Sequence, residues 1–195
     1  MADSVHFDRD EALDGFLDLF WRKGYRNSTT KELARSAGIS EGSLFNSFNS
    51  KRDIYILSLQ RYREKSRSML EQMESNPSAL EGIHQYWNAV GVLAADTSRT
   101  RGCMITNASL ETADDPEIRE FMKSIHLDYD KEFKRTLDRA VKQGELKQGT
   151  DTAALAQYLS HSAQGLRVLS RFNPSRRKVG NIVRLTMATV DQYRT

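Results

Sequence analysis

Short hydroxyl and amide side chains recur at helical spacing near the start of the chain. Ser43, Asn46 and Ser47 fall on the outer side of a predicted short helix, because Leu44 and Phe48 occupy the opposite side at i, i+4 spacing. Such side chains suit the phosphate oxygens and base edges of a DNA major groove. The alternative is a plain helical hairpin, which explains the apolar positions but not the polar outer side.

Local signals on either side predict the elements that would position these groups. Thr29 and Glu32 form an S/T-x-x-E capping box, which begins a first short helix. Gly38 stands where a helix needs a left-handed residue to end, and Ser40 is a good N-cap for the helix that follows. Two short helices joined by a turn with glycine predict a helix-turn-helix unit.

Composition narrows the classes of protein. The 195 residues are 38% hydrophobic and 28% charged, which is a globular balance, and only 3 prolines and 11 glycines interrupt it. The formal net charge is +3, yet residues 22–65 hold ten basic side chains against four acidic ones. A basic segment in a balanced chain is typical of a protein that binds a polyanion, although a solvated helix face is the alternative. A single cysteine excludes an internal disulfide and favours a cytoplasmic location, and neither a signal peptide nor an apolar run of bilayer length is present.

Apolar periodicity predicts an all-α fold of about nine helices. The expected ranges are residues 8–24, 29–37, 40–48, 50–75, 78–95, 103–112, 116–143, 151–171 and 175–193. The helices predict a DNA-binding domain at residues 1–50 and a helical body at residues 51–195. Small residues recur in the last two helices, so these helices either pair with a second subunit or close an intramolecular core.

Residues 11–58 resemble the DNA-binding domain of TetR-family transcriptional regulators. The resemblance is carried by Gly24-Tyr25, Thr29-Thr30, Ala37-Gly38-Ile39-Ser40, Gly42-Ser43-Leu44-Phe45 and Ser50-Lys51-Arg52-Asp53-Ile54. Phe45 departs from the family, which usually has tyrosine there, and Glu41 stands where lysine or a neutral residue is frequent. Gly102-Cys103-Met104 with Asn107 and Glu111 resembles the NemR-like and AcrR-like branch of the family.

The resemblance implies a repressor that binds a palindromic operator as a homodimer, through residues 151–193, and is released by a small-molecule effector. It implies DNA contacts from Thr29, Thr30, Ser40, Glu41, Gly42, Ser43, Phe45, Asn46, Ser47 and Lys51. It also implies an effector pocket in the body, for which the candidate lining is Tyr62, Met69, Tyr86, Trp87, Val90, Cys103, Met104, Asn107, Ile125, His126, Tyr129, His161 and Gln164. For each lining residue, ordinary core packing is the alternative.

No enzyme signature stands out in the sequence. The four histidines lack a metal-ligand spacing, and no glycine-rich phosphate loop or GxSxG motif occurs, so neither a metal nor a cofactor is expected. Cys103 follows Arg99 and Arg101 at the start of a predicted helix, where positive charge favours the thiolate, so it is either a sensor of electrophiles or a small buried hydrophobe. The second interpretation of the whole chain is a helical sensing protein whose DNA binding is weak or lost.

Overall fold

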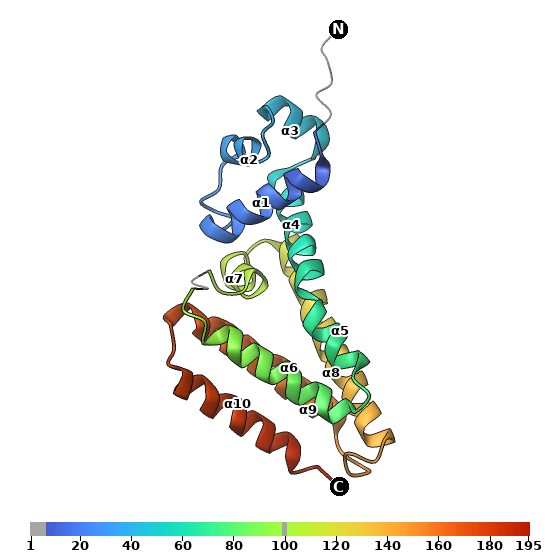
Figure 1. The fold of residues 1–195 in the computed structure, drawn as a ribbon. Coiled ribbons are helices and arrows are strands. Elements are labelled where there is room, and N and C mark those ends of the chain that lie inside the picture. The colour runs from blue at the N-terminus through green and yellow to red at the C-terminus, as the bar shows by residue number, and fades with distance from the viewer. Residues whose placement is uncertain (1–6, 99–100) are drawn as a thin grey trace. The chain divides into compact units, whose positions relative to one another are not determined.

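The computed structural model describes residues 7–98 and 101–195, and helices dominate it (Figure 1). Within these residues the all-α prediction is confirmed, since the only β-type pairing is an isolated antiparallel bridge between Leu146 and Arg194. The elements are α1 Arg9–Lys23, α2 Thr30–Ser36, α3 Glu41–Ser47, α4 Lys51–Ser66, α5 Ser68–Ser75, α6 Ala79–Ala94, α7 Met104–Glu111, α8 Pro116–Lys142, α9 Thr152–Leu169, the short 3-10 helix η1 Ser170–Phe172 and α10 Arg176–Asp191. None of the described helices has the length and apolar character needed to cross a bilayer.

The described chain has ten α-helices where about nine were expected, because the predicted helix over residues 50–75 is divided at Arg67 into α4 and α5. No proline or glycine marks this division. The hydroxyl of Ser66 donates to the carbonyl oxygen of Arg63 at 3.1 Å, a local bond that competes with helical pairing and bends helices. Arg67 keeps a helical conformation and acts as the N-cap residue of α5 without a side-chain bond.

The chain forms two compact units, and its predicted division into a DNA-binding domain at residues 1–50 and a body at residues 51–195 stays a prediction. The head comprises Met1–Ser66 together with Asn107–Met122, and the body comprises Arg67–Thr106 together with Lys123–Thr195. The head therefore includes all of α4. The helices α7 and α8 each begin in one unit and continue into the other.

Apolar residues of α1 to α4 form the core of the head. Phe16, Leu33, Leu44, Ile54 and Leu59 are fully buried. Two aromatic pairs in edge-to-face geometry join α1 to its neighbours: Phe16 with Phe48 at 5.3 Å between centroids and Phe20 with Tyr55 at 4.9 Å. This core holds α2 and α3 in place and so fixes the outward side of both.

The body has a separate core, in which α6 packs against α5, α9 and α10. Its largest buried side chains include Trp87, Phe133, Met73 and Ile83. The ring of Tyr86 meets that of Phe133 edge-on at 5.2 Å. The apolar sides that give these helices their predicted periodicity face this core.

Candidate nucleic-acid interface and ligand site

The turn between α2 and α3 has the geometry that the local sequence predicts. The hydroxyl of Thr29 accepts from the backbone N–H of Glu32 at 3.3 Å, while the Glu32 carboxylate accepts from the N–H of Thr29 at 3.0 Å, so the capping box is confirmed. Gly38 has φ +66°, and its N–H donates to the carbonyl oxygen of Arg35. The N–H of Ile39 donates to the carbonyl oxygen of Ala34. This pair of bonds is the Schellman motif, which ends α2 and turns the chain toward α3.

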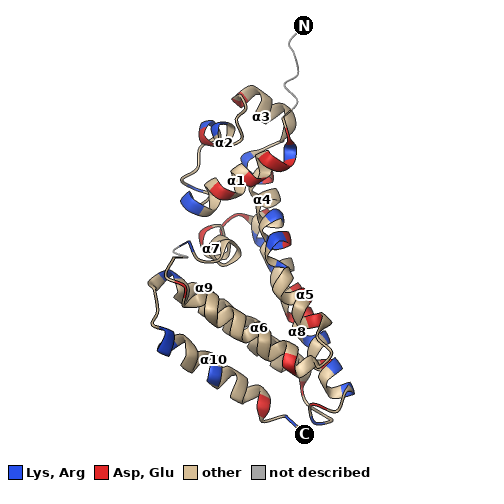
Figure 2. Cartoon of the chain, viewed as in Figure 1, with Lys and Arg blue, Asp and Glu red and all other residues tan. Residues whose placement is uncertain are grey.

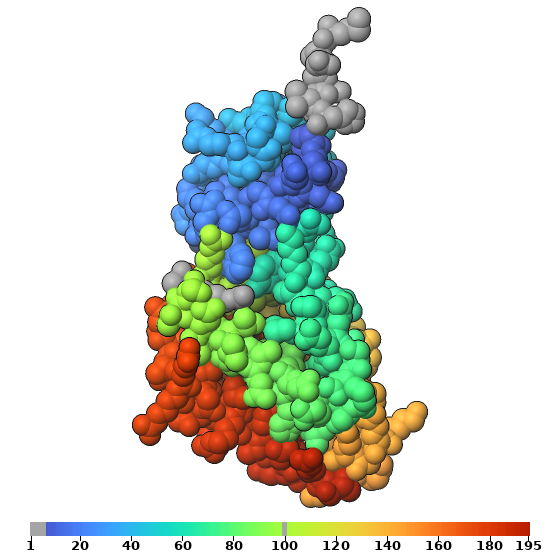
Figure 3. Space-filling view, viewed as in Figure 1, coloured from blue at the N-terminus to red at the C-terminus, as the bar shows by residue number. Residues whose placement is uncertain are grey.

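The outward face of α3 is a single stripe of exposed residues. Glu41, Gly42, Phe45 and Asn46 are exposed, whereas Leu44 is fully buried against the head core. The spacing i, i+1, i+4, i+5 places these four residues side by side on a helix. The charged residue of α3 is the acidic Glu41, whereas α2 carries both acidic and basic side chains (Figure 2). In Figure 3 the residues of α2 and α3 lie at the surface of the head.

Several predicted DNA contacts also serve the local fold. The hydroxyl of Ser40 accepts from the N–H of Ser43 at 3.0 Å and lies 2.9 Å from the Ser43 hydroxyl, so Ser40 caps α3. The hydroxyl of Thr30 donates to the Glu41 carboxylate at 3.1 Å and thereby links α2 to α3. Ser43 and Ser47 are half-buried at the edge of the exposed stripe. The direct contact of each of these residues with DNA stays a prediction.

Lys51 lies differently from a freely extended phosphate ligand. Its Nζ is 4.6 Å from the centre of the Tyr25 ring, a cation–π contact, and the side chain is half-buried. Burial lowers the pKa of Lys51, and the nearby Glu111 carboxylate opposes that effect. Burial also raises the pKa of Tyr25. The hydroxyl of Ser50 accepts from the N–H of Asp53 at 3.0 Å and caps α4.

The turn after α1 binds a carboxylate from a distant part of the sequence. Glu111, at the end of α7, accepts from the backbone N–H of Tyr25 at 3.0 Å and from that of Arg26 at 2.8 Å. Gly24 has φ +79°, and a Cβ at that position would lie 2.7 Å from both carboxylate oxygens of Glu111. Glycine at position 24 therefore serves both the backbone turn and the approach of Glu111.

Ion pairs surround this contact on the same side of the head. Arg26 binds Asp114 at 3.0 Å, and Arg52 binds Asp115 at 2.9 Å and Glu117 at 3.3 Å. Burial would raise the pKa of Asp115, but hydrogen bonds from the Ile118 N–H and from Arg52 hold it below its ordinary value. Residues 107–122 are thus fastened to the rest of the head through charged groups.

Comparison with known proteins identifies the family to which this helix-turn-helix protein belongs. Residues 12–56 match the family model described as bacterial regulatory proteins, tetR family, and residues 79–185 match the one described as Tetracyclin repressor-like, C-terminal domain. The chain belongs to the TetR family. It is a transcriptional regulator and not an enzyme, and the comparisons do not distinguish a NemR-like or AcrR-like branch within the family.

Relatives of this TetR-family regulator cover nearly its whole length. It is 26% identical over 98% of its length to the uncharacterized HTH-type transcriptional regulator YezE of Bacillus subtilis (strain 168), all of which is covered. It is 27% identical over 93% of its length to the HTH-type transcriptional repressor ComR of Escherichia coli (strain K12), with 88% of that protein covered. Among solved structures, a cysteine mutant of the TetR-family regulator CifR complexed with 26bp double-strand operator DNA has a TM-score of 0.83 at 25% identity, covering 94% of this chain and 97% of that one.

The predicted effector lining of the regulator is divided between its two units. Tyr62 and Asn107 belong to the head, and the other eleven residues belong to the body. Six are buried and His161 is exposed; the buried ones are Tyr86, Trp87, Val90, Met104, Ile125 and Tyr129. Met69, Cys103, His126 and Gln164 are half-buried. Whether these residues line a pocket stays a prediction.

Part of this set is joined by a polar cluster inside the body. Arg167 donates to the Tyr86 hydroxyl at 2.9 Å and its guanidinium carbon lies 5.3 Å from the centre of the Tyr129 ring. Thr106 donates to the Gln164 side-chain oxygen at 2.7 Å. Neither Arg167 nor Thr106 is among the predicted lining residues. An arginine near the end of an apolar helix gave no signal, because its partners lie 38 or more residues away in sequence.

A histidine and a tryptophan of the body carry further chemistry. Burial lowers the pKa of His126, and the charges of His161 and Arg167 lower it further, which favours the neutral imidazole. Trp87 is fully buried, and its indole N–H has no acceptor within the described part of the chain. An unsatisfied buried donor is costly, so Trp87 is a point where a ligand acceptor would be stabilising.

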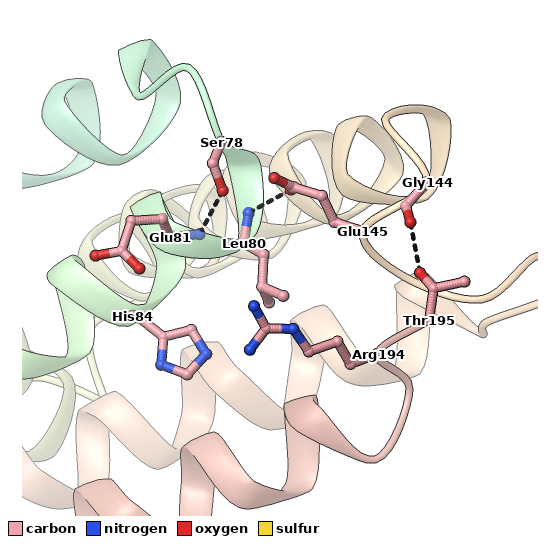
Figure 4. Close-up of a pocket in the computed structure, with 8 residues that line it drawn as sticks. All are labelled: Ser78, Leu80, Glu81, His84, Gly144, Glu145, Arg194 and Thr195. Carbon is pink, nitrogen blue, oxygen red and sulfur yellow. Dashed lines mark hydrogen bonds between the residues drawn. The ribbon is translucent and has the colours of Figure 1, made fainter.

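Two surface cavities of the body lie apart from all thirteen predicted lining residues. One, of 310 Å³, is lined by Ser78, Leu80, Glu81, His84, Gly144, Glu145, Arg194 and Thr195 (Figure 4). There the N–H groups of α6 are already satisfied, since Glu145 accepts from Leu80 and the Ser78 hydroxyl accepts from Glu81. The other, of 1060 Å³, is an open groove between α6 and α10. No group of three His, Cys, Asp or Glu side chains in the described residues is placed to hold a metal ion.

Cys103 is half-buried and directly precedes Met104, the first residue of α7. Arg101 is exposed nearby in the sequence, while Arg99, the other predicted source of positive charge, lies outside the described residues. The role of Cys103 as a sensor of electrophiles stays a prediction.

Proposed function

We propose that this TetR-family regulator is a cytoplasmic repressor that binds a quasi-palindromic operator as a homodimer and releases it when a small molecule binds the body. The observation that carries the proposal is the exposed stripe of α3, which a capped turn and a buried core hold outward. In helix-turn-helix proteins the second helix enters the major groove, and a dimer places two such helices one helical turn apart. The relative ComR is named a transcriptional repressor, which supports repression over activation.

Exposed apolar groups on the last two helices support the dimer. Leu185 on α10 is 58% exposed and Tyr158 on α9 is 41% exposed, and both helices also have small exposed residues, which are Gly165, Gly180 and Ala188. Small side chains let two helix pairs approach closely, and the exposed leucine and tyrosine would become buried between them. Val183, by contrast, is buried inside the body, where a Cβ on Gly91 would lie 2.9 Å from it.

Release by an effector requires that the ligand bind two states of the protein with different affinity. The body supplies an apolar interior with two side-chain hydrogen bonds, Arg167 to Tyr86 and Thr106 to Gln164, and the unsatisfied indole of Trp87. We infer an effector that is largely apolar and carries a hydrogen-bond acceptor. Because α7 and α8 each have residues in both units, a shift of either helix would move the segment of the head that carries Glu111 and Asp115.

The test is selection of DNA from a random pool by the purified full-length protein. We expect an enriched inverted repeat, whose affinity falls steeply with salt because several phosphates are contacted. Lys31→Glu on the exposed surface of α2 should weaken binding, while the matched control Lys131→Glu on the body helix α8 should not. Failure to enrich any sequence would favour the alternative, a sensing protein with weak or lost DNA binding, which the family relationship does not favour.

A further inference from the structure

The α3 helix presents an aromatic ring to solvent at the centre of its outward stripe. Phe45 is 50% exposed, whereas Leu44 is fully buried and Phe48 is 4% exposed. Phe48 packs edge-on against Phe16 at 5.3 Å, but within the described residues Phe45 has no ring contact. The head core therefore does not use Phe45, although the side chain is among the largest on the helix.

Exposure alone would not distinguish Phe45, since single exposed apolar residues are common on protein surfaces. Its position does, because the ring stands between Glu41 and Asn46 on the face that would enter the groove. Gly42 on the same face has no side chain, and a Cβ built there would meet only the Ser40 hydroxyl at 3.8 Å. The ring is therefore open to an approaching base pair from the side of Gly42.

The chemistry of the ring restricts what it can recognise. A phenyl group has no hydrogen-bond donor or acceptor, so it cannot bind a phosphate as a tyrosine hydroxyl could. On the major-groove edges of the four base pairs, the apolar group is the C5-methyl of thymine, and apolar side chains recognise it by contact. Burial of a methyl group against the ring also removes part of the exposed ring from water.

We propose that Phe45 is a specificity-determining residue that selects thymine in each operator half-site by contact with its C5-methyl group. This inference rests on the proposed function, because it needs α3 in a major groove. It goes beyond that function by stating one base and the chemical group that is read.

The experiment replaces each thymine of the selected operator, one position at a time, with deoxyuridine, which lacks only the methyl group. At one thymine per half-site, the wild-type protein should lose affinity about fourfold, the equivalent of one methylene-sized group no longer buried. Phe45→Ala should bind the thymine and deoxyuridine operators equally. Phe45→Leu, which restores an apolar side chain, should again prefer thymine.

The control is Asn46→Ala, which changes the adjacent exposed residue of α3 and should leave the thymine preference intact. Thermal unfolding of each variant checks that the head is folded, as expected for substitutions of exposed side chains. If the wild-type protein binds a selected operator but tolerates deoxyuridine everywhere, the thymine contact is refuted while the proposed function stands. A preference that persists in Phe45→Ala refutes it too. If no sequence is enriched, the proposed function and this contact both fail.

Discussion

The carboxylate of Glu111 gives the sharpest test of how residues 107–122 are attached to the rest of the head. It accepts two backbone hydrogen bonds, from Tyr25 at 3.0 Å and Arg26 at 2.8 Å. A hydrogen bond to a charged group contributes about 1.5–3 kcal/mol where water cannot replace it. Tyr25 is half-buried but Arg26 is exposed, so water compensates for the second bond and Glu111→Ala should cost about 2 kcal/mol.

Amide hydrogen exchange at Tyr25 and Arg26 measures this contact locally. A loss of about 2 kcal/mol should speed exchange at Tyr25 by about thirtyfold, provided that the turn opens without global unfolding. Glu111→Gln keeps one acceptor oxygen and should fall between Glu111→Ala and wild type.

The matched control is Asp114→Ala, which also removes one carboxylate that contacts Arg26. That ion pair joins side chains that are 63% and 90% exposed, and such pairs contribute about 0–1 kcal/mol. Asp114→Ala should therefore change the exchange of Tyr25 by about fivefold at most. Equal exchange in Glu111→Ala and Asp114→Ala would refute the reasoning, because it would mean that charge alone, and not the two backbone bonds, holds the turn.

Three further outcomes are expected. The Glu32 carboxyl has a pKa of about 2 against an ordinary 4.5, chiefly because Lys23 donates a hydrogen bond to it. Because the pKa is lower in the folded state, the stabilisation is present above pH 4.5 and is lost as the pH falls toward 2. Glu32→Gln should therefore flatten the acid dependence of the unfolding free energy in unfolding titrations. Lys51→Ala should weaken binding to all DNA sequences alike and lower the salt slope by about one phosphate, and an unchanged slope would assign Lys51 to its cation–π contact alone. Leu185→Glu on α10 should give folded monomers in analytical ultracentrifugation, while the control Leu127→Glu on α8 should stay dimeric. If both variants are dimeric, α10 is not part of the dimer interface.

The helix-turn-helix could be predicted in detail because every signal for it is local. The capping box of Thr29 and Glu32, the left-handed Gly38 and the Ser40 cap each act within four residues. Such contacts are fixed by residue type and spacing, which a sequence displays directly. The exposed side of α3 was predicted only in part from the buried Leu44 and Phe48: Asn46 is exposed as expected, but Ser43 and Ser47 are half-buried.

The contacts that join distant segments could not be predicted in this way. Glu111 lies 86 residues from Tyr25, and no spacing rule relates a helix C-terminal glutamate to a turn elsewhere in the chain. Arg167 reaches Tyr86 across 81 residues for the same reason. The division at Arg67 was missed because neither proline nor glycine stands near it, and a serine in a polar sequence does not by itself indicate a break.

These distant contacts also limit how strongly an effector can act on DNA binding. A ligand shifts an equilibrium only by its differential affinity for the two states, and the shift must reach the head through contacts that differ between them. Glu111, the last residue of α7, and Asp115, which directly precedes α8, make contacts within the head, and both helices have further residues in the body. If release breaks the Glu111 bonds, the coupling available from them is about 2 kcal/mol, or about thirtyfold in operator affinity. A larger measured release would require a second route, and α4, which leads from the head to the start of the body at Arg67, is the remaining covalent connection.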